Sequence, residues 1–336
     1  MPFDIALIGT GWVAEKHIAA IGKIPGARVA AIAGRNGARL AELSSSCGAA
    51  PYADYREMLA KERLDAAFIL LPPHLHGELE LACAARVPAI LVEKPVARDM
   101  ATAARAAEAF EREGTFAAAA YMNRCRPSVA KAKASFAAPN PAPVLVEGRW
   151  VGDIPSPAWW RDKALSGGQF VEQCTHLVDL ARYIVGEPVE VSAGAASGFV
   201  DGLQGYATDD AMSVKLRFAS GALGSFTTGC YARPGIYAEG GISMEIGSRE
   251  LRCSLSGWDM DLVLRRWAGE GRGIQTESVK SEGDIFEIED RLFIEAARSG
   301  DPSLFPSSYA DAMRTLAVTL AANESAASGR SVRIEA

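Results

Sequence analysis

The chain begins with a glycine-rich turn that separates a short apolar run from a helical pattern. The apolar run covers residues 3–8, the helical pattern covers residues 12–23, and the turn between them reads Gly9-Thr10-Gly11-Trp12-Val13-Ala14. Gly9 permits a tight turn, Gly11 lets the backbone approach a pyrophosphate, and Ala14 allows close packing of helix on strand. The N–H groups of the first helical turn then face the phosphates. The spacing predicts a dinucleotide-binding turn, and an ordinary tight turn is the alternative.

Strand and helix patterns alternate through the first 120 residues. This alternation predicts a doubly wound parallel sheet with helices on both faces. Ligands of such sheets bind beyond the carboxyl ends of the strands, so the residues that follow each strand are candidate site residues. The expected strands are residues 3–8, 29–33, 66–71, 89–92 and 116–120, and the expected helices are 12–23, 37–46, 54–61, 74–86 and 99–113.

Strand patterns with short turns dominate the rest of the chain. Meandering strands at about ten-residue spacing predict a large, mostly antiparallel sheet. The expected strands are residues 144–151, 189–199, 207–218, 221–230, 239–246, 249–254, 259–267, 272–279 and 331–334, and the expected helices are 126–137, 170–185, 284–298 and 307–325.

Length, charge and cysteine usage limit the class of protein. A chain of 336 residues favours two domains. The formal net charge of −6 argues against a nucleic-acid surface. No segment approaches the ~20 apolar residues of a membrane span, and no export signal precedes the first strand. The six cysteines form no CxxC pair, so we interpret them as reduced thiols and expect a cytoplasmic protein.

The end of the second strand bears on the choice of cofactor. It reads Ala33-Gly34-Arg35-Asn36. An acidic residue here would bind the ribose 2′-hydroxyl of NAD, but Gly34 stands at that position. Arg35 has two N–H donors for a 2′-phosphate, so NADP(H) is the preferred cofactor and NAD(H) remains possible. The alternative is that Arg35 is a solvated loop residue.

Three histidines in this region need an interpretation. His74 and His76 follow the strand at 66–71, and an i, i+2 pair invites a zinc hypothesis. No acidic or cysteine residue lies at ligand spacing, so we expect no metal. We expect His76 to lie near the cofactor in the first turn of the next helix, and His17 to be a packing residue.

A lysine lies where chemistry is expected in a parallel sheet. The strand at residues 89–92 is followed by Glu93-Lys94-Pro95. Burial and a neighbouring nicotinamide cation both disfavour the ammonium form of Lys94, which suits proton transfer. Pro95 restricts the backbone after the lysine, and a cis Lys94–Pro95 peptide bond is one form that this restriction can take. The alternative is a surface lysine at a strand end.

Two further groups of residues predict a site in the second half of the chain. Trp159 and Trp160 lie in a Pro-rich loop, where they either form a wall over a ligand or pack in the core. Glu172 and His176 follow a Gly-Gly pair and are expected on one helix at i, i+4, which places them on the same face. For an isolated helix, a solvated pair is the alternative.

Taken in order, these motifs cover nearly the whole chain. They are the glycine turn at 9–14, Leu-Pro-Pro-His-Leu-His at 71–76, Glu-Lys-Pro at 93–95, Asn-Arg-Cys-Arg-Pro at 123–127, and Gly167-Gly168 followed by Glu172, His176 and Asp179. Their order and spacing resemble the Gfo/Idh/MocA oxidoreductases, the family of glucose–fructose oxidoreductase and inositol dehydrogenase.

The resemblance implies a fold and a set of roles. It implies an α/β Rossmann domain followed by an α+β domain with a large, mostly antiparallel open sheet, which we assign to residues 1–121 and 122–336. It implies that Lys94 is the catalytic lysine, that His176 is its partner, and that Trp160 and Arg161 lie near the nicotinamide. It also implies a homodimer or homotetramer formed through the exposed face of the second sheet. Glu172 stands where the family usually has Asp.

The resulting hypothesis is an NAD(P)-dependent dehydrogenase or reductase that acts on the CH–OH group of a sugar, inositol or related polyhydroxy compound. One alternative is an enzyme that retains NAD and cleaves glycosides or epimerises sugars by transient oxidation. The other is a non-catalytic NAD(P)- or sugar-sensing regulator. The expected catalytic residues are Lys94, His176 and Glu172; the expected cofactor contacts are Gly9, Thr10, Gly11, Trp12, Val13, Gly34, Arg35, Asn36, Leu71, Pro72, His76, Glu93, Lys94, Asn123, Trp160 and Arg161; the expected substrate contacts are Lys94, Tyr121, Trp160, Glu172, Gln173 and His176.

Overall fold

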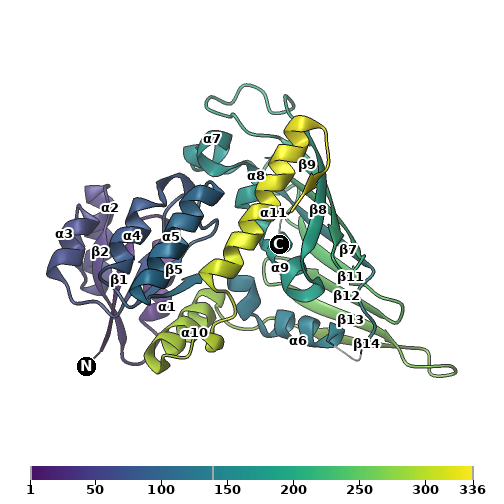
Figure 1. Cartoon of the computed structure of the whole chain (residues 1–336), viewed down its shortest axis with the longest axis horizontal. Helices are drawn as coiled ribbons and strands as arrows, with labels where there is room; N and C mark the ends of the chain where they lie inside the picture. The colour runs from purple at the N-terminus through teal and green to yellow at the C-terminus, as the bar shows by residue number, and fades with distance from the viewer. Residues whose placement is uncertain (1, 138–139, 335–336) are drawn as a thin grey trace. The chain divides into compact units, whose positions relative to one another are not determined.

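The computed structural model describes residues 2–137 and 140–334 (Figure 1). The chain forms two compact units, Met1–Cys125 with Gly283–Met313 and Arg126–Glu282 with Arg314–Ala336. Both units are therefore discontinuous in sequence. The expected division into residues 1–121 and 122–336 did not include the return of residues 283–313 to the first unit.

The first unit contains a six-stranded parallel sheet. Its strand order is β3-β2-β1-β4-β5-β6, which confirms the expected doubly wound sheet. Strand β3 was not expected, because its three residues include a proline and give almost no strand pattern; it pairs only with β2 at the sheet edge, where proline is tolerated. The strands are β1 (Phe3–Ile8), β2 (Ala27–Ala33), β3 (Ala50–Tyr52), β4 (Ala66–Ile69), β5 (Ala89–Val92) and β6 (Phe116–Ala119).

The helices of the first unit follow the predicted alternation with one correction. The helix expected at residues 74–86 begins only at Glu78, because a short 3-10 turn and Gly77, at φ +124°, precede it. Side chains of Asn36, Asp54 and Asp99 cap three of the helices. The elements are α1 (Trp12–Ile21), α2 (Gly37–Cys47), α3 (Tyr55–Lys61), η1 (Pro73–Leu75), α4 (Glu78–Ala84), α5 (Met100–Glu113), η2 (Met122–Cys125), α10 (Ile285–Ser299) and η4 (Pro302–Leu304).

Helix α10 belongs to the first unit because its aromatic residues pack on the parallel sheet. Phe293 lies edge-on to Phe68 of β4, with ring centroids 5.2 Å apart, and stacks on Phe116 of β6 at 5.3 Å. It also contacts Phe305, which follows η4. These rings are part of the apolar core of this unit. A helix encoded after residue 280 therefore completes the core of the first unit.

The second unit contains a nine-stranded sheet. The strand order is β14-β13-β12-β11-β7-β10-β9-β8-β15, and all neighbours are antiparallel except β7 and β10. Burial alternates along β9 and β10, so one face of the sheet is covered and the other is exposed. The strands are β7 (Leu145–Asp153), β8 (Pro188–Ala196), β9 (Ala211–Phe218), β10 (Leu223–Ala232), β11 (Ile242–Gly247), β12 (Leu251–Ser256), β13 (Asp261–Trp267), β14 (Ile274–Val279) and β15 (Val332–Arg333).

The helix expected at residues 170–185 is interrupted. The N–H groups of Gln173 and Cys174 both donate to the carbonyl of Gln169, four and five residues earlier, so the turn widens and the regular helix stops. Glu172 therefore ends one helix and His176 lies on the next, and the i, i+4 argument for a shared face is wrong. The helices of this unit are α6 (Pro127–Phe136), η3 (Ala158–Arg161), α7 (Lys163–Ser166), α8 (Gln169–Glu172) and α9 (Thr175–Val185), with most of α11 (Tyr309–Ser328).

Helices α9 and α11 cover the buried face of the large sheet (Figure 1). Their apolar side chains form one cluster with inward-facing residues of the strands, including Val214 and Phe226. Within the described part of the chain, no helix combines the length and the apolar character that a membrane span requires.

Candidate active site

The glycine turn has the geometry of a nucleotide-binding loop. Gly9 has φ +128°, and a Cβ atom at this position would lie 2.3 Å from the carbonyl oxygen of Leu70. Gly11 is the N-cap of α1, and a Cβ built there meets no atom within 4 Å. No side chain caps α1. Its first N–H groups therefore have no side-chain acceptor, which fits the binding of a pyrophosphate.

Packing explains why the second strand ends in glycine. A Cβ atom at Gly34 would lie 2.4 Å from the methyl carbon of Thr10. The side chain of Thr10, within the glycine turn, therefore fills the space that an acidic residue at position 34 would need. An acid that contacts the ribose, as in NAD sites, would fit here only if the Thr10 side chain moved.

The residues after Gly34 offer positive charge at the same edge of the sheet. Arg35 is exposed, and it has no ion-pair partner among the residues that the structure describes. Asn36 caps α2 by accepting a hydrogen bond from the N–H of Arg39 at 3.2 Å. The guanidinium of Arg39 is paired with Glu15 and Glu42. Arg35 is thus the guanidinium of this region that is available to a ligand.

His76 uses both ring nitrogens within the protein. Nδ1 lies 2.5 Å from Oε1 of Glu80, and Nε2 lies 3.0 Å from the carbonyl oxygen of Leu71. Both side chains are buried. Burial lowers the pKa of His76, but the Glu80 carboxylate outweighs burial and raises it. The ring therefore holds the Leu71–Pro72 segment through the carbonyl oxygen of Leu71. His76 ends η1 and precedes α4, so the expectation that it lies in the first turn of that helix is wrong.

Lys94 follows the last residue of β5 by two positions. The Lys94–Pro95 peptide bond is cis, which is the backbone restriction that the sequence had left open. The N–H of Glu93 donates to Ile69 at 2.9 Å, which extends the pairing of β5 with β4. The carboxylate of Glu93 accepts a hydrogen bond from the backbone N–H of Lys94 at 3.0 Å. Both side chains are half-buried at the carboxyl edge of the sheet. Nearby, Tyr121 and Asn123 are buried in the same unit.

His17 is more than a packing residue. Its Nδ1 atom lies 2.8 Å from Oδ1 of Asp290, and both residues are fully buried. Within the described residues, one group of His, Cys, Asp or Glu has the spacing of a metal site: His17, Glu289 and Asp290, with ligand atoms within 4.8 Å of one another. The 2.8 Å contact has the length of a charged hydrogen bond, so we interpret the group as an ion pair. In the sequence, the signal for this pair was Asp290, an acidic residue at a buried position of the helical pattern at 284–298.

Glu172 and His176 are both buried in the second unit. The ring of His176 stacks on Trp150 of β7, with centroids 5.4 Å apart and planes at 22°. The amide oxygen of Gln173 accepts a hydrogen bond from the Cys230 thiol at 2.5 Å. Gln169, one turn before Gln173, is buried and its amide has no hydrogen-bond partner among the described residues. Its position in α8 makes Gln169 a further candidate site residue, which is not among the expected site residues above.

The paired tryptophans form a stacked unit. The rings of Trp159 and Trp160 lie 5.6 Å apart with planes at 16°, and both are partly exposed. Backbone hydrogen bonds of 2.8 and 3.0 Å tie Arg161 and Lys163 to Ala207. The structure thus holds Trp160 and Arg161 on an anchored 3-10 turn, with Glu172, Gln173 and His176 in the same unit. The remaining expected site residues lie in the first unit.

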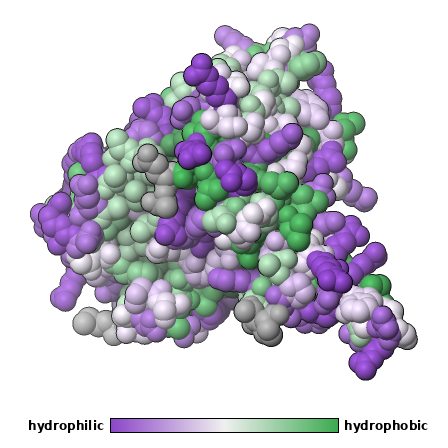
Figure 2. All heavy atoms as spheres, turned by 45° about the vertical axis from the view of Figure 1, so that its right-hand side comes forward, coloured by the Kyte–Doolittle hydropathy of each residue, from purple (hydrophilic) through white to green (hydrophobic). Residues whose placement is uncertain are grey.

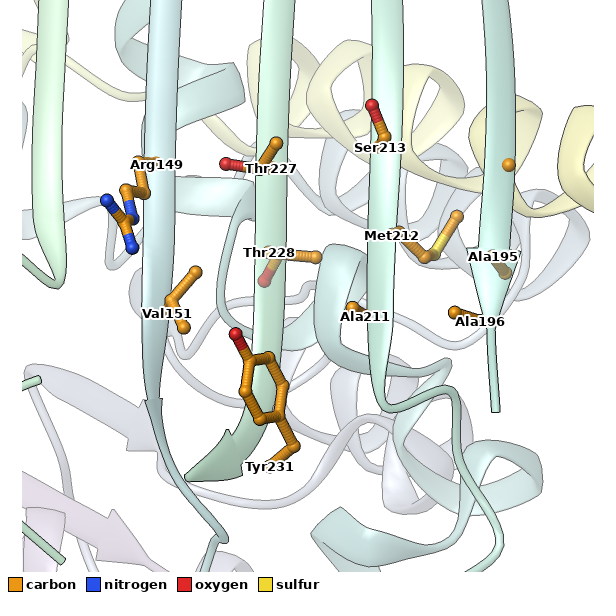
Figure 3. Close-up of a pocket in the computed structure, with 11 residues that line it drawn as sticks. Arg149, Val151, Ala195, Ala196, Ala211, Met212, Ser213, Thr227, Thr228 and Tyr231 are labelled. Carbon is orange, nitrogen blue, oxygen red and sulfur yellow. The ribbon is translucent and has the colours of Figure 1, made fainter. Parts of the chain in front are cut away.

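A separate hollow lies on the outer face of the large sheet (Figure 3). Its volume is about 520 Å³. Side chains of four neighbouring strands line it, and its polar members are Arg149, Ser213, Thr227, Thr228 and Tyr231. None of the expected site residues contributes to this hollow.

Comparison with family models identifies the two halves of the chain. Residues 3–121 match the model described as "Oxidoreductase family, NAD-binding Rossmann fold", and residues 129–250 match the "GFO/IDH/MocA C-terminal domain". The chain belongs to the Gfo/Idh/MocA family. It is therefore an NAD-binding oxidoreductase, as the motifs had indicated.

Known relatives agree with this assignment. The chain is 27% identical over 337 residues to the myo-inositol 2-dehydrogenase of Thermotoga maritima, with 98% of each chain covered. It is 28% identical over 257 residues to the levoglucosan dehydrogenase of Pseudarthrobacter phenanthrenivorans, with 66% of each covered. A solved levoglucosan dehydrogenase in complex with NADH has the same fold, with a TM-score of 0.87, 22% identity and full coverage of both chains.

Substitution of the two glycines of the turn should affect different properties of the protein. Gly9→Ala should lower the free energy of unfolding by about 1–3 kcal/mol, because its backbone conformation and the Leu70 carbonyl both exclude a side chain. Gly11→Ala should cost about 1 kcal/mol or less in stability. It should nevertheless weaken NADH and NADPH binding, because the methyl group stands where the pyrophosphate approaches. Denaturant unfolding and fluorescence titration measure the two effects. Wild-type nucleotide affinity in Gly11→Ala would contradict the predicted phosphate position.

Proposed function

We propose that the enzyme catalyses NAD(P)-dependent oxidation or reduction at a CH–OH carbon of a sugar, an inositol or a related polyhydroxy compound. The observation that carries the proposal is the position of Lys94 at the carboxyl end of β5. The glycine turn follows β1, and β4 alone separates β1 from β5 in the sheet. Ligands of such sheets bind at this edge, next to the point where the strand order reverses.

The chain supplies groups for proton transfer and for orientation. When bound, the nicotinamide supplies the hydride chemistry. Lys94 would exchange the proton of the reacting hydroxyl and stabilise the developing oxyanion. His176 would relay that proton or bind the neighbouring hydroxyl, and Glu172 would orient it. The stacking of His176 on Trp150 supports a fixed ring orientation.

The substrate class rests on the family and on the names of the relatives. The two relatives above are named for inositol and levoglucosan, both of which are polyhydroxy compounds. The stacked, partly exposed Trp159 and Trp160 supply the kind of flat apolar surface that packs against the C–H face of a sugar ring.

We place the enzyme in the cytoplasm, since its six cysteines are free thiols.

We further propose a preference for NADP(H). Thr10 blocks an acidic side chain at position 34, so no carboxylate repels a 2′-phosphate there. Arg35 is exposed, and the N-terminus of α2 adds partial positive charge beside it. NAD(H) would bind the same loop through its pyrophosphate, without the contribution of the arginine.

We also propose that the enzyme forms a homodimer or homotetramer through the outer face of the large sheet. Leu145 of β7 and Leu223 of β10 are register partners, and about half of each side chain is exposed. Charges of both signs flank them, with Glu147 and Lys215 on the same face. In Figure 2, where this side of the chain comes forward, hydrophobic side chains lie among hydrophilic ones. Such a mixed surface and the hollow of Figure 3 suit contact with a second copy.

Loss of the lysine tests the proposed reaction. Lys94→Met should lower kcat about 10²–10⁴-fold, the usual contribution of a general acid or base, while cofactor affinity stays near wild type. Lys61→Met, an exposed lysine on α3, is the control and should retain full activity. The assay follows nicotinamide reduction with myo-inositol and levoglucosan as test substrates. Full activity of Lys94→Met would refute the assignment, and NAD retained through purification would favour the transient-oxidation alternative.

Loss of the arginine tests cofactor preference. Arg35→Ala should weaken NADPH binding more than NADH binding by about 1–3 kcal/mol, the range for a charged hydrogen bond. Arg39→Ala is a matched control on α2, because its guanidinium already pairs with Glu15 and Glu42. Fluorescence titration with both cofactors gives the two affinities. Equal losses for NADH and NADPH would remove the case for NADP.

Charge on the outer sheet face tests self-association. The double variant Leu145→Glu/Leu223→Glu should shift the wild-type dimer or tetramer to monomer, because it places two like charges where an apolar contact is proposed. Sedimentation velocity reports the mass of both proteins. Glu57→Lys/Lys61→Glu, a charge exchange within one exposed pair on α3 and away from the large sheet, is the control. A monomeric wild-type protein would contradict the proposal directly.

A further inference from the structure

A group of four charged residues in the first unit has no part in the proposed reaction. His17 lies on α1, Glu289 and Asp290 lie on α10, and Glu93 follows β5. Three elements that are far apart in sequence bring one imidazole and three carboxyl groups together. The first three of these residues are almost completely buried, and the carboxylate of Glu93 is 14% exposed.

The imidazole of His17 faces a carboxylate on each side. Nδ1 is hydrogen-bonded to Oδ1 of Asp290 at 2.8 Å. Nε2 lies 4.0 Å from Oε1 of Glu93 and has no hydrogen-bond partner among the described residues. Carboxylates on both sides favour the imidazolium form, in which Nδ1–H donates to Asp290 and the N–H at Nε2 faces Glu93 at ion-pair distance.

The surroundings of His17 strengthen these interactions. The edges of Phe68 and Phe286 meet the ring at centroid distances of 5.3 and 5.4 Å and keep water from it. Burial disfavours the charged ring, but Asp290, Glu93 and Glu289 outweigh it and raise the pKa of His17 to about 10. Burial also raises the pKa of Asp290, and Asp284 at the start of α10 adds to that effect. The imidazolium therefore persists across the neutral range.

Glu93 connects this group to the proposed catalytic lysine. One carboxylate oxygen, Oε1, faces His17, and the other, Oε2, accepts the backbone N–H of Lys94 at 3.0 Å. The N–H of Glu93 itself is bonded to Ile69 of β4. The carboxylate is thus held between the buried imidazolium on one side and the peptide group of the lysine on the other.

We propose that His17 and Asp290 are positioning residues, which hold the Glu93 carboxylate and, through it, the backbone of Lys94 in the arrangement that proton transfer requires. This inference rests on the proposed role of Lys94. Asp290 orients the imidazole and keeps it charged, and the imidazole pairs with Glu93. Helix α10, which comes from the far end of the chain, thereby acts on the lysine without contacting the substrate.

Two variants separate this role from a purely structural one. His17→Asn keeps a donor near the position of Nδ1 but leaves Asp290 buried without a cation, so it should lower the midpoint of denaturant unfolding. His17→Asn/Asp290→Asn replaces the ion pair by two neutral amides of similar shape. We expect this double variant to recover most of the lost stability, because no uncompensated charge remains buried.

The readout is the pH dependence of alcohol oxidation. In the double variant the cation that faces Glu93 is gone, so the negative field of Glu93 at Lys94 is no longer offset and the ammonium form persists to higher pH. The pH of half-maximal kcat should move upward by about half a unit or more, with little change in KM. NMR titration of wild type, with only four histidines in the chain, should show His17 still protonated above pH 8.

Each outcome decides between the proposals. A stable double variant with the wild-type pH profile, while Lys94→Met is inactive, would overturn the positioning role and leave the proposed function intact. An active Lys94→Met would instead overturn the proposed function. A wild-type His17 that titrates near pH 6.5 would refute the imidazolium. One divalent metal ion per wild-type chain, lost in the double variant, would also refute it, because the three buried side chains would then be ligands.

Discussion

The close approach of the glycine turn to β4 constrains the whole nucleotide-binding edge. Gly9 passes so near the Leu70 carbonyl that no side chain fits between them. Thr10 follows in the turn, and its methyl carbon lies 2.4 Å from the place of a Cβ atom at Gly34, so a larger residue after β2 would require Thr10 to move. The next residue, Arg35, then projects to solvent beside the capped start of α2. One steric contact in the turn therefore limits the side chains at the end of the neighbouring strand.

The fold could be predicted from local patterns because both sheets follow strong periodicities. The alternation of apolar runs and helices predicted the parallel sheet, and strand patterns with short turns at about ten-residue spacing predicted the antiparallel one. The glycine turn and the residues after β5 could also be located, since positions after parallel strands carry sites. The sequence allowed a cis bond before Pro95 but did not require it.

The features that were missed depend on contacts between distant segments. The widened turn between α8 and α9 arises because two N–H groups share the carbonyl of Gln169, a choice that residue type does not signal. His17 and Asp290 are 273 positions apart, so neither residue indicates its partner in a local window. The return of α10 to the parallel sheet likewise depends on aromatic contacts with Phe68 and Phe116. Helix periodicity predicted α10 but not the sheet it covers.

The return of α10 has a consequence for how this chain is made and recombined. During synthesis the first 125 residues emerge long before the helix that completes their core, so Phe68 and His17 stay uncovered until about residue 300 has been added. The first unit thus cannot reach its final packing until residues 126–282 of the second have been translated. For the same reason, a gene fragment that ends at residue 125 encodes a sheet with an unfilled apolar face and a histidine without its carboxylate partner. Exchange of nucleotide-binding modules between relatives would have to carry residues 283–313 along with the N-terminal segment.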